Sequence, residues 1–169
     1  SQRRLSQSAM ESLSDRFSRY LAHRMPEAHD LEVVRLVRIH GGASRETWRC
    51  GVRWQENGLD YERGLILRRD PVGSLIETDR RVEFAACATF RDGAVPVPEA
   101  LFLEEDERWL ERPFFVMAEM PGRAANPFEP GVYGAAAERT GDEFWTILGR
   151  IAATPVAGTP LAERLVAPA

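Results

Sequence analysis

The sequence contains no lysine, so all 22 of its basic residues are arginines. Cysteine is also scarce: Cys50 and Cys87 lie far apart in apolar surroundings, without a C-x-x-C pair or a Cys/His cluster. This pattern argues against a zinc site and favours two reduced thiols in the core. No apolar run approaches the roughly 18 residues of a membrane-spanning helix, and the N-terminus lacks the apolar segment of a signal peptide. We therefore expect a cytoplasmic protein with no membrane partner.

An excess of positive charge is missing as well. The net charge is −4, so the chain has no overall attraction to nucleic acid and we expect none as a partner. Its 169 residues are 44% hydrophobic and 28% charged, which are the values of one ordinary globular domain.

The residue pattern predicts a helix, three strands, a helix, two strands and a further helix. Apolar residues recur at helical spacing in the helices and alternate with polar residues in the strands. The predicted ranges are a helix over 8–25 that ends before Pro26, strands over 31–39, 47–54 and 60–69, a helix over 76–91, strands over 101–103 and 114–120, and a helix over 144–151 capped by Asp142. Asn57-Gly58 is a strong hairpin signal, and 104–108 is predicted to be an acidic turn. The fold class is therefore α+β, with a five-stranded antiparallel sheet and a packed helix.

The strand that ends at Asp70-Pro71 carries two adjacent arginines. Side chains alternate across a strand, so Ile66 and Arg68 share one face while Arg69 lies on the other. A cation on a buried strand needs an anionic partner. The ordinary alternative is that a long cationic side chain near a strand end reaches solvent.

The small residues Gly41, Gly42, Ala43 and Ser44 lie between the first two predicted strands. Such residues let backbone N–H groups approach an anion closely, so this turn could cover a phosphate. An ordinary hairpin turn explains the same residues. The order of parts favours the first reading, because a glycine-bearing hairpin, a strand ending in a cation, a helix with a glutamate and two further strands follow the plan of a kinase N-lobe. Glu83, on the helix after Arg68, is then the predicted carboxylate partner of that arginine.

Several segments in this order resemble the aminoglycoside phosphotransferase family. The closest likeness is to the branch that includes the kinase-like domain fused to some acyl-CoA dehydrogenases. The segments that carry the resemblance are 41–48 (GGASRETW), 67–71 (LRRDP), 95–98 (VPVP) and 113–122 (PFFVMAEMPG). The resemblance covers residues 30–123 well and 124–155 loosely.

The resemblance implies a site for ATP or GTP with Mg²⁺. Gly41 to Ser44 would cover the nucleotide, and Ile66 would lie against adenine. Arg68 falls where most kinases place a lysine that contacts the phosphates. A guanidinium can pair bidentately with phosphate and with Glu83, so the departure is compatible with that role.

The segment Met117-Ala118-Glu119-Met120 resembles the hinge that reads the adenine edge. Met117 would guard the back of the pocket, while the Ala118 C=O and the Met120 N–H would bond the base. Both methionines also suit a plain apolar core.

The catalytic half of the family pattern is missing. No H-x-D-x-x-x-x-N motif is present, because the histidines are only His23, His29 and His40. We therefore expect no catalytic residue and no metal ligand in this chain, and we expect it to be the N-terminal part of a longer kinase-like protein. The expected division is an N-terminal helical extension over 1–29, a kinase-like N-lobe over 30–121, and a hinge, linker and first C-lobe helices over 122–169.

Three functional hypotheses follow from the sequence. The first is the nucleotide-binding part of a phosphotransferase that acts on a small-molecule hydroxyl, inactive as this chain alone. The second is a non-catalytic nucleotide-binding or regulatory module derived from the same fold. The third is a generic α+β domain that resembles kinases by accident. An isolated lobe would also expose the surface that packs on the C-lobe, so self-association is expected as a risk.

Overall fold

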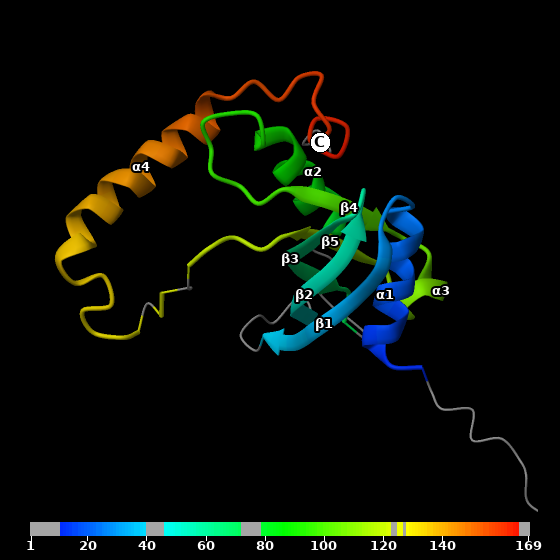
Figure 1. The fold of residues 1–169 in the computed structure, drawn as a ribbon. Coiled ribbons are helices and arrows are strands. Elements are labelled where there is room, and N and C mark those ends of the chain that lie inside the picture. The colour runs from blue at the N-terminus through cyan, green and yellow to red at the C-terminus, as the bar shows by residue number, and fades with distance from the viewer. Residues whose placement is uncertain (1–10, 40–45, 72–78, 123–124, 127, 166–169) are drawn as a thin grey trace, which may run out of the picture. The chain divides into compact units, whose positions relative to one another are not determined.

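Five strands and four α-helices make up the α+β architecture of the described chain (Figure 1). The structure is a computed structural model, and it describes residues 11–39, 46–71, 79–122, 125–126 and 128–165. The elements are α1 (Leu13–Arg24), β1 (His29–Ile39), β2 (Glu46–Glu56), β3 (Leu59–Arg69), α2 (Arg80–Phe90), β4 (Ala100–Glu104), α3 (Glu107–Leu110), β5 (Phe114–Ala118), the 3₁₀-helix η1 (Gly134–Ala136) and α4 (Ala137–Ala153). The strands form one sheet in the order β1-β2-β3-β5-β4. The predicted fold class is confirmed.

The chain divides into two compact units. Unit 1 comprises Ser1–Val72 and Glu104–Phe114, and it holds α1, the first three strands and α3. Unit 2 comprises Gly73–Leu103 and Phe115–Ala169, and it holds α2, β4, β5, η1 and α4. Each unit is described by itself.

The core of unit 1 lies between α1 and its neighbours. Phe17, Tyr20 and Leu21 of α1 are completely buried. The Tyr20 ring makes edge contacts with Trp109 and Phe114, at centroid distances of 5.3 and 4.8 Å. Serines on α1 also bond the backbone of β1: the Val33 N–H donates to Ser18 Oγ at 3.1 Å, and Ser14 Oγ donates to the Val33 C=O at 3.3 Å. Polar and apolar contacts together fix the helix on the sheet.

One cluster of the core of unit 2 lies around α2. Ala85 and Phe90 of α2 pack with Val95 and Leu161, and Ile147 of α4 lies partly buried against this cluster. The Leu161 N–H donates to Thr89 Oγ1 at 3.1 Å, which ties the C-terminal segment to α2. No residue of α4 is completely shielded from solvent.

Three expectations about element ends need correction. The first helix begins at Leu13 because Ser12 and Asp15 form a capping box; the predicted start at residue 8 lies outside the described residues. The expected acidic turn over 104–108 is wrong, since Asp106 caps the short helix α3 through the Arg108 N–H. Asp142 does not cap α4: it lies inside the helix, which begins after Ala136.

Two other observations concern the scarce residues and the helices. Cys50 is buried in the core, as expected, whereas Cys87 is only partly buried, and neither forms a disulfide. Among the described residues, no helix has the length and apolar character needed to cross a membrane.

Candidate functional site

The β2–β3 hairpin positions the arginine pair. Asn57 and Gly58 adopt left-handed conformations, with φ of 51° and 76°, and these are the values of a two-residue hairpin turn. From this turn the strands pair without a bulge, so that Thr47 lies opposite Arg68 and Glu46 opposite Arg69. Residues that lie opposite each other in a pair of strands share a face.

The face that carries Ile66 and Arg68 is less buried than its opposite. Both residues are half-buried, whereas Leu65, Leu67 and Arg69, on the other face of β3, are buried. The strand that carries Arg68 is therefore packed against the protein through its opposite face. The prediction that the two arginines point in opposite directions is confirmed.

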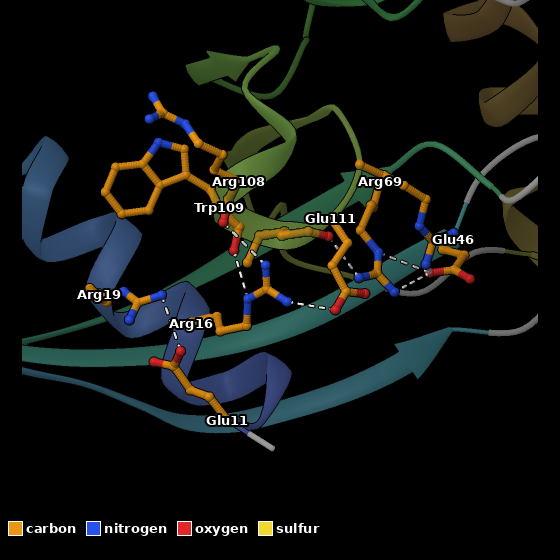
Figure 2. A network of polar contacts seen from close by, with 10 residues as sticks. Glu11, Arg16, Arg19, Glu46, Arg69, Arg108, Trp109 and Glu111 are labelled. Carbon is orange, nitrogen blue, oxygen red and sulfur yellow. Dashed lines mark hydrogen bonds and ion pairs between the residues drawn. The ribbon is translucent and has the colours of Figure 1, made fainter. Parts of the chain in front are cut away.

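Arg69 belongs to a cluster of charges on the buried face of the hairpin. Figure 2 shows its guanidinium and the Glu46 carboxylate directed toward each other. Arg69 Nε and Nη2 donate to Glu46 Oε2 at 3.1 and 2.7 Å, and Nη1 donates to the Leu110 C=O at 3.1 Å. Arg112 Nη2 donates to the same Oε2 at 3.2 Å, and Arg38 Nη2 lies 3.7 Å from Oε1.

This cluster holds Glu46 in its charged form. Burial alone would raise the pKa of Glu46, but hydrogen bonds and charges from Arg69 and Arg112 outweigh burial and lower the pKa below its ordinary value of 4.5. The rule that a cation on a buried strand needs an anion holds here, and it applies to a pair that the sequence argument did not name. The buried cation is Arg69, and its partner is Glu46.

Sequence reasoning missed Glu46 and Arg112, although the signal for Glu46 was present. A two-residue turn at Asn57-Gly58 fixes the register, because each step away from the turn on β2 is matched by one step on β3. Counting back along both strands places Glu46 opposite Arg69. Arg112 follows α3 in the sequence, and no local sequence pattern predicts its contact with Glu46.

Glu83 lies in the first turn of α2, within unit 2. Asp79 caps this helix by accepting the Arg81 N–H at 2.8 Å, and the Glu83 N–H donates to the Asp79 C=O at 3.2 Å. A carboxylate near a helix N-terminus is stabilised by the helix dipole. Glu83 is half-buried.

The predicted hinge residues also lie in unit 2. Met117 and Ala118 end β5, and the Ala118 N–H donates to the Glu99 C=O at 2.9 Å, which anchors the strand end. Glu119 follows half-buried, and Met120 is 49% exposed. The chain thus leaves the sheet at the point where the hinge was predicted.

The structure therefore places the predicted site residues in two groups. Ile66 and Arg68 belong to unit 1, while Glu83 and 117–120 belong to unit 2. Gly41, Gly42, Ala43 and Ser44 lie outside the described residues, between β1 and β2. The pairing of Arg68 with Glu83 stays a prediction. Within the described ranges, no group of three or more His, Cys, Asp or Glu side chains could hold a metal ion.

Comparison with solved structures identifies the fold. A solved structure described as a "putative aminoglycoside phosphotransferase" from Ralstonia eutropha JMP134 matches with a TM-score of 0.57 at 20% identity, over 84% of this chain and 38% of that one. The fold is thus that of the kinase-like phosphotransferases, and this chain spans well under half the length of that protein. A search of curated proteins finds no match.

The family assignment comes from a separate comparison. Residues 35–168 match the family described as "Phosphotransferase enzyme family". Because this match covers most of the sequence, the chain belongs to that family. The resemblance found in the sequence is confirmed.

Proposed function

We propose that this chain is the nucleotide-binding part of an ATP- or GTP-dependent phosphotransferase that acts on a small-molecule hydroxyl. The observation that carries the proposal is the place of Arg68 in a chain of this family. Arg68 comes from the half-buried face of β3, next to a strand end that Arg69 anchors from the other face. Kinase-like folds use a cation at this point to contact nucleotide phosphates.

The other predicted residues have roles consistent with this proposal. Ile66 shares the face of Arg68 and offers an apolar surface for adenine. Glu83 would pair with the guanidinium of Arg68. The backbone of Ala118 and Met120 would bond the adenine edge, with Met117 behind the base, and Gly41 to Ser44 would cover the phosphates.

Mg²⁺ would enter with the nucleotide. The described residues contain no acidic cluster that fits a divalent ion by itself, and the sequence has no H-x-D-x-x-x-x-N motif. We therefore propose that the catalytic carboxylate and the metal ligands come from the part of the family fold that this chain does not span. The purified chain alone should then show no phosphoryl transfer, and measurable metal-dependent turnover would contradict this.

A titration of the ¹⁵N-labelled chain with MgATP and with MgGTP, followed by NMR, tests nucleotide binding. We expect one of the two to bind, and Arg68→Ala to weaken that binding roughly 10- to 100-fold, the equivalent of a charge-assisted hydrogen bond. Arg53→Ala is the matched control, since Arg53 lies on the same hairpin and pairs with Glu32 in solvent. Equal affinity of wild type and Arg68→Ala would overturn the assignment.

The lack of the catalytic motif also suits the second hypothesis, a non-catalytic nucleotide-binding module. Sequencing the gene beyond Ala169 separates the two. An H-x-D-x-x-x-x-N motif within the next few dozen codons supports the enzyme, whereas a stop codon supports the module.

A further inference from the structure

We propose that Glu46, Arg69 and Arg112 are positioning residues for Arg68, and that they act from the face of the hairpin opposite to the proposed nucleotide site. The inference rests on the proposed function, because it assumes that Arg68 contacts the nucleotide. It adds three residues that touch no ligand and that determine where the Arg68 side chain leaves the sheet.

The first part of the argument is the geometry of the hairpin. Arg68 and Arg69 are consecutive, so a fixed Arg69 also fixes the backbone from which Arg68 projects. The Glu46–Arg69 pair lies directly beside the Thr47–Arg68 pair in the register. A shift of one residue between the strands would bring Arg68 to the buried face. The Glu46–Arg69 ion pair opposes that shift, because it requires both side chains on the same face.

The second part is the number of contacts on the end of β3. Arg69 Nη1 donates to the Leu110 C=O at 3.1 Å, and Arg112 Nη1 donates to the Asp70 C=O at 2.9 Å. The Asp70 N–H in turn donates to the Pro113 C=O at 3.0 Å. The residues that follow Arg68 are therefore held both by the start of β2 and by the segment 110–113. All of these contacts lie within unit 1.

The third part is the burial of the cluster. The side chains of Arg69, Glu46 and Arg112 are only 10%, 15% and 18% exposed. In an exposed pair that joins β2 to β1, Arg53 and Glu32 are 59% and 63% exposed and join through one bond of 3.1 Å. Buried ion pairs bring little net stability compared with apolar residues of similar volume, but they are directional. A cluster in which one carboxylate oxygen accepts three N–H groups can therefore hold the start of β2 and the end of β3 in one position.

The test uses the complete chain, ¹⁵N-labelled, with MgATP and MgGTP as probes. The nucleotide that binds the wild type is titrated into Glu46→Gln and into the control Glu32→Gln, each at a temperature where circular dichroism shows a folded protein. We expect Glu46→Gln to bind about tenfold more weakly and to lose the nucleotide-induced shift of the Arg68 Nε–H signal. Glu32→Gln should match the wild type in both measurements. A residue that only supports stability would leave the affinity and the shift of the folded protein unchanged.

Arg112→Lys keeps the test decisive if Glu46→Gln does not fold. This change leaves the Glu46–Arg69 bonds intact and keeps the charge, but it removes the fork that joins Glu46 to the Asp70 C=O. Its affinity should fall between those of the wild type and Arg68→Ala. Wild-type affinity in Glu46→Gln or Arg112→Lys, with weak binding by Arg68→Ala, would overturn this inference alone. Failure of the wild type to bind either nucleotide would overturn the proposed function as well.

Discussion

Helices α1 and α4 are both amphipathic, but the apolar side chains of α1 are buried far more deeply than those of α4. Helix α1 has 12 residues and buries Phe17, Tyr20 and Leu21 completely. Helix α4 has 17 residues and buries none, and its Phe144 and Trp145 are 58% and 68% exposed. An apolar stripe therefore predicts a helix in both cases, but it does not predict what the helix packs against.

The polar contacts of the two helices differ in the same direction. In α1, Arg16 Nε donates to the Trp109 C=O at 2.9 Å and Nη1 pairs with Glu111 at 2.6 Å (Figure 2). In α4, Arg150 makes one such bond, from Nη1 to the Ala94 C=O at 3.0 Å. We therefore expect α1 to contribute more to the stability of unit 1 than α4 contributes to that of unit 2. Three measurements test this difference between the helices, and a fourth tests the charge cluster of unit 1.

The largest effect is expected from truncation of the α1 core. Phe17→Ala should lower the free energy of unfolding of unit 1 by about 3–5 kcal/mol, because it removes a fully buried ring and leaves a cavity. Phe144→Ala is the matched control on α4 and should change stability by less than about 0.5 kcal/mol. Urea denaturation followed by circular dichroism measures both. Equal losses in the two variants would mean that α4 is as tightly packed as α1.

The next effect is expected at the charge cluster of unit 1. Glu46→Gln should cost about 3 kcal/mol at pH 7, because it leaves the largely buried Arg69 and Arg112 without their anion. Since the pKa of Glu46 is lower in the folded chain, its contribution is present above pH 4.5 and is lost as the pH falls through the folded-state pKa. The stability difference between wild type and variant should therefore shrink below pH 4.5. Thermal unfolding between pH 7 and pH 3.5 measures it, and a constant difference would contradict the assignment.

A smaller effect is expected at the N-terminal caps of α1 and α4. Ser12→Ala should destabilise unit 1 by about 1 kcal/mol, because the Asp15 N–H donates to Ser12 Oγ at 3.1 Å. Helix α4 has no side-chain cap at Ala136, so Ala136→Ser offers the reciprocal change and should stabilise by a few tenths of a kcal/mol. Chemical denaturation of both variants tests this difference. If Ser12→Ala loses no more stability than Ala136→Ser gains, then the N-terminal N–H groups of α1 and α4 are equally well hydrogen-bonded.

The sequence was informative where contacts are local. The Asn57-Gly58 turn, the alternation along β2 and β3, and the stop before Pro26 all follow from short-range patterns, and the structure agrees with them. Asp106 and Asp142 show the limit: Asp106 was expected in a turn and Asp142 at a helix cap, yet Asp106 caps a helix and Asp142 does not. Capping depends on where the backbone leaves the helical conformation, and residue types alone do not predict that position.

The candidate site shows the same limit for contacts between distant segments. The opposite directions of Arg68 and Arg69 follow from strand alternation alone. The contact of Arg112 with Glu46 joins positions 66 residues apart, and it depends on how α3 returns the chain to the sheet. The kinase-like order of parts supplied the predicted role of Glu83, and the family resemblance supplied that of Met117, because no local pattern connects either residue with Arg68.

The smallest effect on stability is expected at the exposed face of α4, where a different property should change. Trp145→Ser should alter the free energy of unfolding by less than about 0.5 kcal/mol, since the ring is 68% exposed. Together with Phe144 and Leu148, however, Trp145 forms an apolar surface that favours association between chains. Sedimentation velocity over a range of concentrations should show less self-association in Trp145→Ser than in the wild type. Leu59→Ser, which removes an exposed apolar residue beside the hairpin turn, is the control and should associate as the wild type does. Equal association in Trp145→Ser and the wild type would mean that α4 does not carry the contact, and the contrast with α1 would then concern stability alone.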